Sequence, residues 1–241
     1  MLNIRNILVS SMEKKKYKYR HELKFKISNS AAKVLQQKLS LIMQPDKFAY
    51  YTDGSYVIKS LYFDDRESKS YYEKMDGVLY RKKYRIRIYN DDKSFIRLEK
   101  KMKHNNYTAK EQMLISEDIY CKILEGKLDE IEEPKGLLKE FIYDSKTKGL
   151  IPSIIVGYHR IAFTYPVSDV RITFDSNIES GLYNYDLFDS QMPTYNLDEK
   201  GKQVLEVKFN EVLPLHIAHI LNDIPSCREA VSKFALCRSI K

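Results

Sequence analysis

Charged and apolar residues alternate along many segments of this chain. In residues 20–27 the even positions carry Arg, Glu, Lys and Lys, and the odd positions are mostly apolar. Successive side chains of a β-strand point to opposite faces, so one face of this segment is charged and the other can pack on a core. The same alternation recurs in residues 81–87, 97–103, 158–160, 171–175 and 206–208. Basic strand faces with a few carboxylates among them indicate that the strands bind a polyanion.

The hydrophobic pattern also divides the chain into elements. Period-two segments predict strands near residues 17–27, 56–63, 80–90, 94–103, 107–115, 153–165, 169–178 and 202–210. Helical spacing predicts a helix at 30–42 capped by Ser28 or Asn29, a short helix at 66–75 ending at Gly77, two or three helices within 116–148, and a helical C-terminus over 214–240. Residues 44–54 and 180–200 are predicted to be loops.

Short connections at residues 91–92 and 104–106 predict antiparallel pairing of the strands that they join. Since no βαβ alternation dominates, the chain is expected to be a mostly antiparallel α+β protein. Eight such strands can close into a β-barrel or tunnel with flanking helices. The charged faces would then line the interior, which must hold water and a ligand because burying cations without counter-ions is too costly. We expect one domain over 17–241, after a flexible lead-in at 1–16.

Composition narrows the classes of function. The formal net charge of +8 makes an anionic partner plausible, and 33 acidic residues exclude a uniformly cationic tail. The three cysteines have no paired spacing, which is typical of reduced thiols in a cytoplasmic protein. No apolar run approaches the roughly 20 residues that span a bilayer. Glycine is sparse and no P-loop motif occurs, which argues against a P-loop enzyme.

The inward basic residues suit a chain of phosphates. Arg85 and Arg87 share one face of a strand about 6.6 Å apart, so they can grip successive phosphates with their planar guanidinium groups. Lys24, Lys101, Lys110 and Lys208 would add point charges. Such an arrangement favours a triphosphate or polyphosphate over a single phosphate.

Three glutamates, Glu22, Glu99 and Glu206, each lie two residues before a lysine and share its face. One interpretation is a divalent metal site, because Mg²⁺ prefers one or two carboxylates together with substrate phosphates. The other is an ion pair across the barrel that keeps the cations from repelling one another. Both interpretations stay open on spacing alone.

Motifs in order along the chain resemble one known family. They are Arg20-x-Glu22-x-Lys24-Phe25, Ser60-Leu61-Tyr62-Phe63-Asp64, Tyr84-Arg85-Ile86-Arg87-x-Tyr89, Leu98-Glu99-Lys100-Lys101, Tyr158-x-Arg160, Arg171-Ile172-Thr173-Phe174-Asp175, Leu205-Glu206-Val207-Lys208-Phe209 and Ser232-Lys233-Phe234. Over roughly residues 17–240 the chain resembles the polyphosphate polymerase domain of the vacuolar transporter chaperone (VTC) family, within the CYTH-like triphosphate tunnel metalloenzymes.

The resemblance implies an antiparallel tunnel in which the γ-phosphate of ATP is transferred onto a growing polyphosphate chain, with Mn²⁺ or Mg²⁺. It implies catalytic roles for Lys24, Arg85, Arg87, Lys101, Arg160, Arg171 and Glu206, with Glu206 as metal ligand and Glu22 and Glu99 as further candidates. Phosphate binding is expected at these basic residues and at Lys110, Tyr158, Lys208, Ser232 and Lys233. No side-chain nucleophile is expected, so catalysis would be positioning and charge neutralisation.

Two departures from the wider superfamily matter. Its classical members begin with Glu-x-Glu-x-Lys, and this chain has Arg20 in place of the first Glu, which argues against a plain two-metal triphosphatase. The inositol-phosphate sensor and membrane helices of eukaryotic VTC chains have no counterpart here, so we expect a cytoplasmic protein whose product export needs a separate membrane protein. No specific nucleic acid is expected as a partner. A triphosphatase and a non-catalytic polyphosphate- or nucleotide-binding module remain the alternatives.

Overall fold

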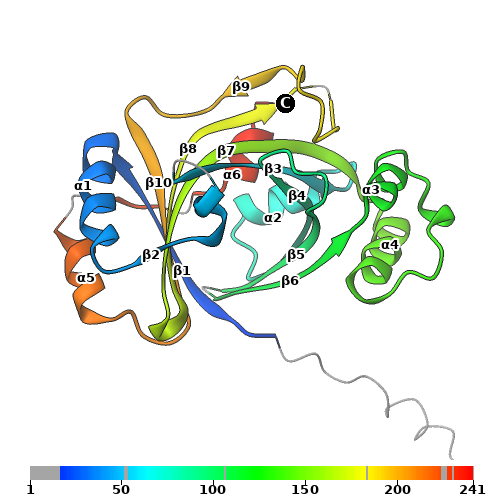
Figure 1. Cartoon of the computed structure of the whole chain (residues 1–241). Helices are drawn as coiled ribbons and strands as arrows, with labels where there is room; N and C mark the ends of the chain where they lie inside the picture. Colours follow the sequence, from blue (N-terminus) through cyan, green and yellow to red (C-terminus); the bar gives the residue numbers. More distant parts are fainter. Residues whose placement is uncertain are drawn as a thin grey trace, which may run out of the picture.

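Eight strands close into an antiparallel barrel, as predicted. The computed structural model describes residues 17–51, 54–105, 107–182, 184–223, 227–229 and 231–240, so the predicted lead-in at 1–16 lies outside the described residues. The barrel strands are β1 (Arg20–Ser28), β3 (Ser55–Asp64), β4 (Tyr80–Tyr89), β5 (Ile96–His104), β6 (Tyr107–Ile115), β7 (Ile151–Tyr165), β8 (Val170–Gly181) and β10 (Lys202–Phe209). Their order around the barrel is β7-β3-β4-β5-β6-β1-β10-β8, and β8 pairs back onto β7 (Figure 1).

Three short strands extend the barrel sheet, and helices flank it. The short strands are β2 (Gln44–Pro45) on β7, β9 (Thr194–Asn196) on β8 and β11 (Cys227–Arg228) on β1. The helices are α1 (Asn29–Ser40), α2 (Lys69–Met75), α3 (Glu117–Leu124), α4 (Gly136–Lys148), α5 (Leu215–Asn222) and α6 (Lys233–Arg238), with 3₁₀ turns η2 (Lys47–Tyr51), η3 (Leu128–Glu130) and η4 (Val167–Asp169). The predicted loops 44–54 and 180–200 therefore contain β2, η2 and β9.

The C-terminal segment differs from the continuous helical region predicted over 214–240. It forms α5, then β11, then α6. The reason lies on the edge of β1, where β6 pairs only with Arg20 and His21 and then diverges. The remaining edge of β1 is free to pair with another strand, and β11 takes it at Phe25 and Lys26.

Local sequence signals fix the helix ends. The Ser28 hydroxyl accepts a hydrogen bond from the Ala31 N–H and caps α1, whose buried face carries Leu35 and Leu39. Gly77 follows the end of α2 with a φ of +72°, a conformation that favours glycine.

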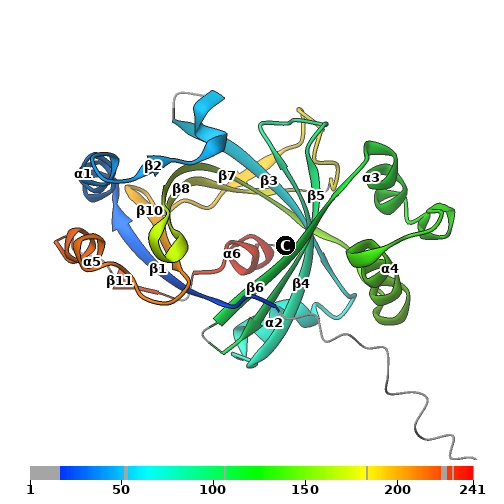
Figure 2. The ribbon, with the colours of Figure 1, turned by 60° about the horizontal axis from the view of Figure 1, so that its bottom comes forward.

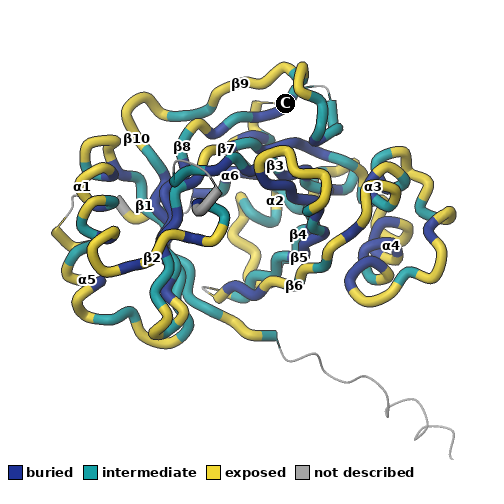
Figure 3. The backbone as a smooth tube through the Cα atoms, viewed as in Figure 1, coloured by how far each residue is buried: buried dark blue, intermediate teal, exposed yellow. Residues whose placement is uncertain are grey.

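Helices cover the outer face of the barrel in two groups (Figures 1 and 3). Helices α1 and α5 pack on the apolar outer residues of β1, β8 and β10, among them Ile172 and Val207. Helices α3 and α4 pack on β3, β4 and β5, where Phe63 meets Phe141 edge to face with ring centroids 4.9 Å apart. Apolar outer faces leave the charged faces of the same strands for the interior.

Helix α6 belongs to neither group, because it lies inside the ring of strands (Figure 2). Its residues Phe234 and Cys237 pack with Val156 and Tyr158 of β7. The N-terminal end of α6 therefore meets the charged interior of the barrel. Within the described residues, no helix is long and apolar enough to cross a bilayer.

Candidate phosphate-binding tunnel

A cavity of about 730 Å³ occupies the barrel interior. Seven of the predicted cations line it: Lys24, Arg85, Arg87, Lys101, Arg160, Lys208 and Lys233. Glu22, Glu206, Tyr158 and Ser232 also line it. The alternation of charged and apolar residues therefore brings most of the predicted site residues together in one cavity.

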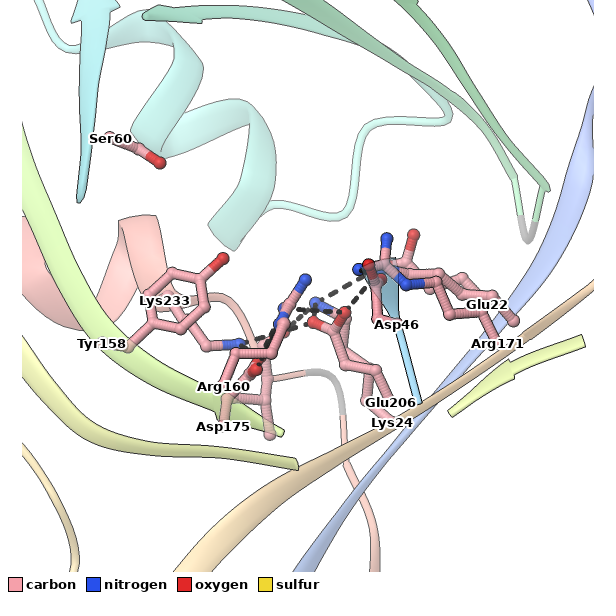
Figure 4. Close-up of polar contacts among 12 residues, drawn as sticks. Glu22, Lys24, Asp46, Ser60, Tyr158, Arg160, Arg171, Asp175, Glu206 and Lys233 are labelled. Atoms are coloured by element: carbon pink, nitrogen blue, oxygen red, sulfur yellow. Dashed lines mark hydrogen bonds and ion pairs between the residues drawn. The ribbon is translucent and has the colours of Figure 1, made fainter. Parts of the chain in front are cut away.

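Glu206 on β10 is the carboxylate around which four cations gather. Its oxygens lie 2.7 Å from Lys208, 3.0 Å from Lys24, 3.4 Å from Lys233 and 3.8 Å from the guanidinium of Arg160 (Figure 4). Burial alone would raise the pKa of Glu206, but these cations hold it well below its ordinary value. Glu206 is thus a permanent anion inside a basic cavity.

A buried ion pair joins β7 to β8 beside Glu206. Nε and Nη2 of Arg160 donate to the two oxygens of Asp175 at 2.6 and 2.7 Å, and both side chains are buried. Lys233 at the start of α6 also binds Asp175, at 2.5 Å. The Ser232 hydroxyl accepts the Ala235 N–H and caps α6, which fixes the position of Lys233.

Lys24 links the barrel wall to the C-terminal segment. Its ammonium lies 3.3 Å from Glu22 and donates to the carbonyl of Val231 at 3.0 Å. Glu22 also binds Lys101 across the barrel at 2.9 Å. Although burial opposes it, Lys101 and Lys24 hold the pKa of Glu22 well below its ordinary value.

The side chains of Arg85 and Arg87 are positioned by different partners. Arg85 binds the fully buried Glu99 at 2.6–2.7 Å and donates to the Tyr62 hydroxyl at 2.8 Å. Arg87 has hydroxyl partners instead, donating to Ser60 and Tyr158 at 3.0 Å each. Its positive charge therefore remains unneutralised by a direct carboxylate contact with any described residue.

Three of the predicted site residues do not line the cavity: Glu99, Lys110 and Arg171. Lys110 binds Glu99 at 2.9 Å, and Glu99 in turn binds Arg85. Arg171 forms an ion pair with Asp46 and donates to the Tyr56 hydroxyl at 2.9 Å. Arg171 would have to leave Asp46 to reach a ligand in the cavity.

Aromatic side chains fill the barrel next to Arg171. Tyr56 faces Arg160 in the strand register, and Tyr89 is the next inward residue after Arg87 on β4. Phe48 of η2 stacks on Tyr89 with ring centroids 4.4 Å apart and packs against Tyr56 at 5.6 Å. These three rings do not line the cavity, so it does not extend into this part of the barrel.

Glu22 and Glu206 are the candidate metal ligands in the cavity. Among the described residues, no three His, Cys, Asp or Glu side chains cluster as metal ligands. Glu22 and Glu206 are ionised and both contact Lys24. Since Mg²⁺ commonly takes one or two carboxylates and completes its shell with water and substrate phosphate, these residues fit an ion that enters with a phosphate chain.

Five cations that line the cavity were not among the predicted site residues: Lys74, Arg81, Lys83, Lys103 and, on β11, Arg228. Arg81, Lys83 and Lys103 continue the alternation that contains Arg85 and Lys101, so the pattern could have identified them. Lys74 lies on α2, and only the tertiary structure brings it to the cavity.

Comparison with known proteins agrees with this geometry. The model of the VTC domain family matches residues 19–240. No curated protein matches the chain. A putative adenylyl cyclase from Hippeastrum, described as having a dominant triphosphatase activity, is 16% identical, with a TM-score of 0.52 over 92% of this chain and 96% of that one. A putative adenylate cyclase from Vibrio parahaemolyticus is 9% identical, with a TM-score of 0.51 over 92% and 98%.

At these identities the two structures show a shared fold, the triphosphate tunnel. Because the family model spans nearly the whole chain, the protein belongs to the VTC domain family.

Proposed function

We propose that this protein is an ATP-dependent polyphosphate polymerase that transfers the γ-phosphate of ATP onto a growing polyphosphate chain. One observation carries the proposal: a cavity inside a VTC-family barrel whose inward cations surround the ionised Glu206. Cations suit phosphate oxygens, and ionised carboxylates among them suit a metal ion that accompanies the phosphates.

In this proposal the protein positions reactants and neutralises charge. Arg85, Arg87 and Arg160 hold phosphate oxygens, with Lys24 and Lys233 as further donors. An oxygen of the acceptor's terminal phosphate forms a bond to the γ-phosphorus of ATP. The bond from that phosphorus to the β–γ bridging oxygen breaks, its electron pair stays on the β-phosphate, and ADP leaves.

Mn²⁺ or Mg²⁺, held by Glu206 and with Glu22 as a second candidate ligand, would supply Lewis-acid neutralisation of phosphate charge. Lys24, which contacts both carboxylates, would then turn to a phosphate oxygen. Glu99 is a weaker candidate for the metal, because it lies outside the cavity lining and binds Arg85 and Lys110.

A triphosphatase is the second candidate, favoured by the activity described for the protein of similar fold from Hippeastrum. Incubation of the purified protein with ATP and Mn²⁺, followed by gel separation of products, distinguishes the candidates. A ladder of polyphosphate supports the polymerase, and orthophosphate alone supports the hydrolase. Absence of both products, with tripolyphosphate still bound, indicates a binding module.

A further inference from the structure

The cations that line the cavity fall into two groups by their partners. Those near Glu206 and Glu99 hold carboxylates or hydroxyls, as described above. In contrast, Lys74, Arg81, Lys83 and Lys103 line the same cavity without an ion pair to any described carboxylate; Arg228 on β11 also lacks one but is exposed. All four are only half-exposed, so their charges are partly removed from water. A partly buried cation without a counter-ion lowers the stability of the fold, unless an anion binds beside it.

Lys83 shows this most clearly. Its ammonium lies 3.9 Å from the ring centroid of Phe234, a buried residue of α6, and this cation–π contact takes the place of an ion pair. Asp64 on β3 is the carboxylate that acts on Lys83, and it accepts hydrogen bonds from the backbone N–H groups of Ser70 and Tyr71 at the start of α2.

The other three cations surround Lys83 from neighbouring elements. Lys74 comes from α2, Arg81 from β4 and Lys103 from β5, and Arg81 donates to the backbone carbonyls of Glu73 and Lys74 in α2. Burial lowers the pKa of Lys83 to about 7; Asp64 opposes this shift, while Arg81, Lys101 and Lys74 add to it. Burial and then Arg81 also lower the pKa of Lys103. Burial and the neighbouring cations thus disfavour the protonated form of Lys83, and a polyanion bound beside the cluster would stabilise it.

Strand β4 sets the distance from this cluster to the inner site. It carries Arg81, Lys83, Arg85 and Arg87 on its inward face, a span of about 20 Å at 3.3 Å per residue. Three linked phosphates are shorter than that span. Phosphates held by Arg85 and Arg87 would leave Arg81 and Lys83 for further members of a longer chain.

We infer that Lys74, Arg81, Lys83 and Lys103 form a mouth subsite for the part of a linear polyphosphate that extends beyond the inner phosphates. The location supports this role, because Asn105 and Tyr107 beside the cluster are exposed strand-end residues that also line the cavity. The inference rests on the proposed function for the identity of its ligand, and it adds a determinant of chain length.

The test compares the binding of two probes without turnover. Tripolyphosphate and long-chain polyphosphate are titrated calorimetrically into the wild-type protein and into a double variant, Lys83→Gln with Lys103→Gln. The matched control carries Lys135→Gln and Lys139→Gln, two exposed charges at the start of α4 outside the cavity. Circular dichroism verifies that the variants are folded.

We expect the mouth variant to bind long-chain polyphosphate about tenfold to a hundredfold more weakly, with tripolyphosphate affinity changed less than about threefold. Its affinity for the long chain should also depend less steeply on salt, since fewer ionic contacts remain. The control should match the wild type for both probes.

An equal loss for both probes, an unchanged long-chain affinity, or the same loss in the control would overturn the mouth subsite. These outcomes concern binding alone. They therefore stand apart from the polymerase assay: a selective loss supports the subsite even if ATP yields no polymer, and a missing loss refutes it even if polymer forms.

Discussion

The ammonium of Lys24 on β1 lies 3.0 Å from a carboxylate oxygen of Glu206 on β10, its direct partner in the strand register. The same ammonium donates to the carbonyl of Val231 at 3.0 Å, just before α6. One lysine thus joins two barrel strands and the C-terminal segment. Any ligand that draws Lys24 away from Glu206 also changes what holds that segment.

Replacing Glu206 with Gln should separate turnover from binding. The substitution removes the shared counter-ion of Lys24, Lys208, Lys233 and Arg160, so tripolyphosphate affinity should be equal or higher. Turnover should fall by about a hundredfold or more, the usual effect of removing one electrostatic group from an active site. Steady-state kinetics and calorimetry measure the two quantities.

The exposed Glu199, which pairs with Lys26 and Lys202, provides a control of equal charge change. Glu199→Gln should leave turnover unchanged. Full metal-dependent activity in Glu206→Gln would show that the metal assignment is wrong.

Arg85→Ala should weaken tripolyphosphate binding by about tenfold to a hundredfold, because the guanidinium offers charge-assisted hydrogen bonds to phosphate. It should also destabilise the fold, since Glu99 is fully buried and would keep only Lys110 as an ion-pair partner. Combining Arg85→Ala with Glu99→Gln removes the buried carboxylate that has lost one of its two partners. The double variant should regain stability in urea titrations but not phosphate affinity; recovery of affinity would argue against a binding role for Arg85.

Asp175→Asn should lower the free energy of unfolding by about 3–5 kcal/mol, because it removes the carboxylate closest to the buried Arg160 and Lys233 and leaves them the longer contacts to Glu206. Urea denaturation measures the change. Asp46→Asn, which leaves the less buried Arg171 unpaired, should cost less. Equal costs for the two variants would contradict the structural importance assigned to Asp175.

Stability should fall in acid. Despite burial, Arg160 and Lys233 lower the pKa of Asp175, and neighbouring cations lower those of Glu22, Glu99 and Glu206. A carboxyl whose folded pKa is depressed stabilises the protein above its unfolded value of about 4, and this contribution disappears as pH falls through the folded pKa. The urea midpoint should therefore decline below about pH 4, and Asp175→Asn should show a shallower decline. An unchanged slope would exclude Asp175 as a contributor.

The Ser232 cap should matter for both stability and binding. Ser232→Ala removes the hydrogen bond from Ala235 and should cost about 0.5–2 kcal/mol, while loosening Lys233 and weakening tripolyphosphate binding. Ser232→Thr retains a capping hydroxyl and should behave almost as the wild type. If the two variants were equally impaired in binding, the cap would not be the cause.

Much of the fold was predictable because the alternation of charged and apolar residues is a local signal. All eight predicted strands are present, and Ser28 caps α1 as expected. The C-terminus was predicted incorrectly as helical throughout, because β11 forms only where β6 leaves the edge of β1. The unpaired edge of β1 arises only when the barrel closes, so the local sequence of the C-terminal segment does not reveal it.

The candidate site was predictable as a set of residues but not as a set of partners. Alternation shows that Arg171 points inward, but it cannot show that Asp46, distant in sequence, binds it. Likewise, Lys83 and Lys101 look equivalent on neighbouring strands. Only the tertiary structure gives a carboxylate to Lys101 and a phenyl ring to Lys83.

The central claim is phosphoryl transfer from ATP to a phosphate acceptor inside the tunnel. Its most direct test follows the label of γ-³²P-ATP, with α-³²P-ATP as control, in the presence of Mn²⁺ and a polyphosphate primer. The account predicts that γ-label enters a polymer that exopolyphosphatase degrades, that α-label does not, and that Glu206→Gln abolishes the transfer. Release of all γ-label as orthophosphate, with none in polymer, would contradict it.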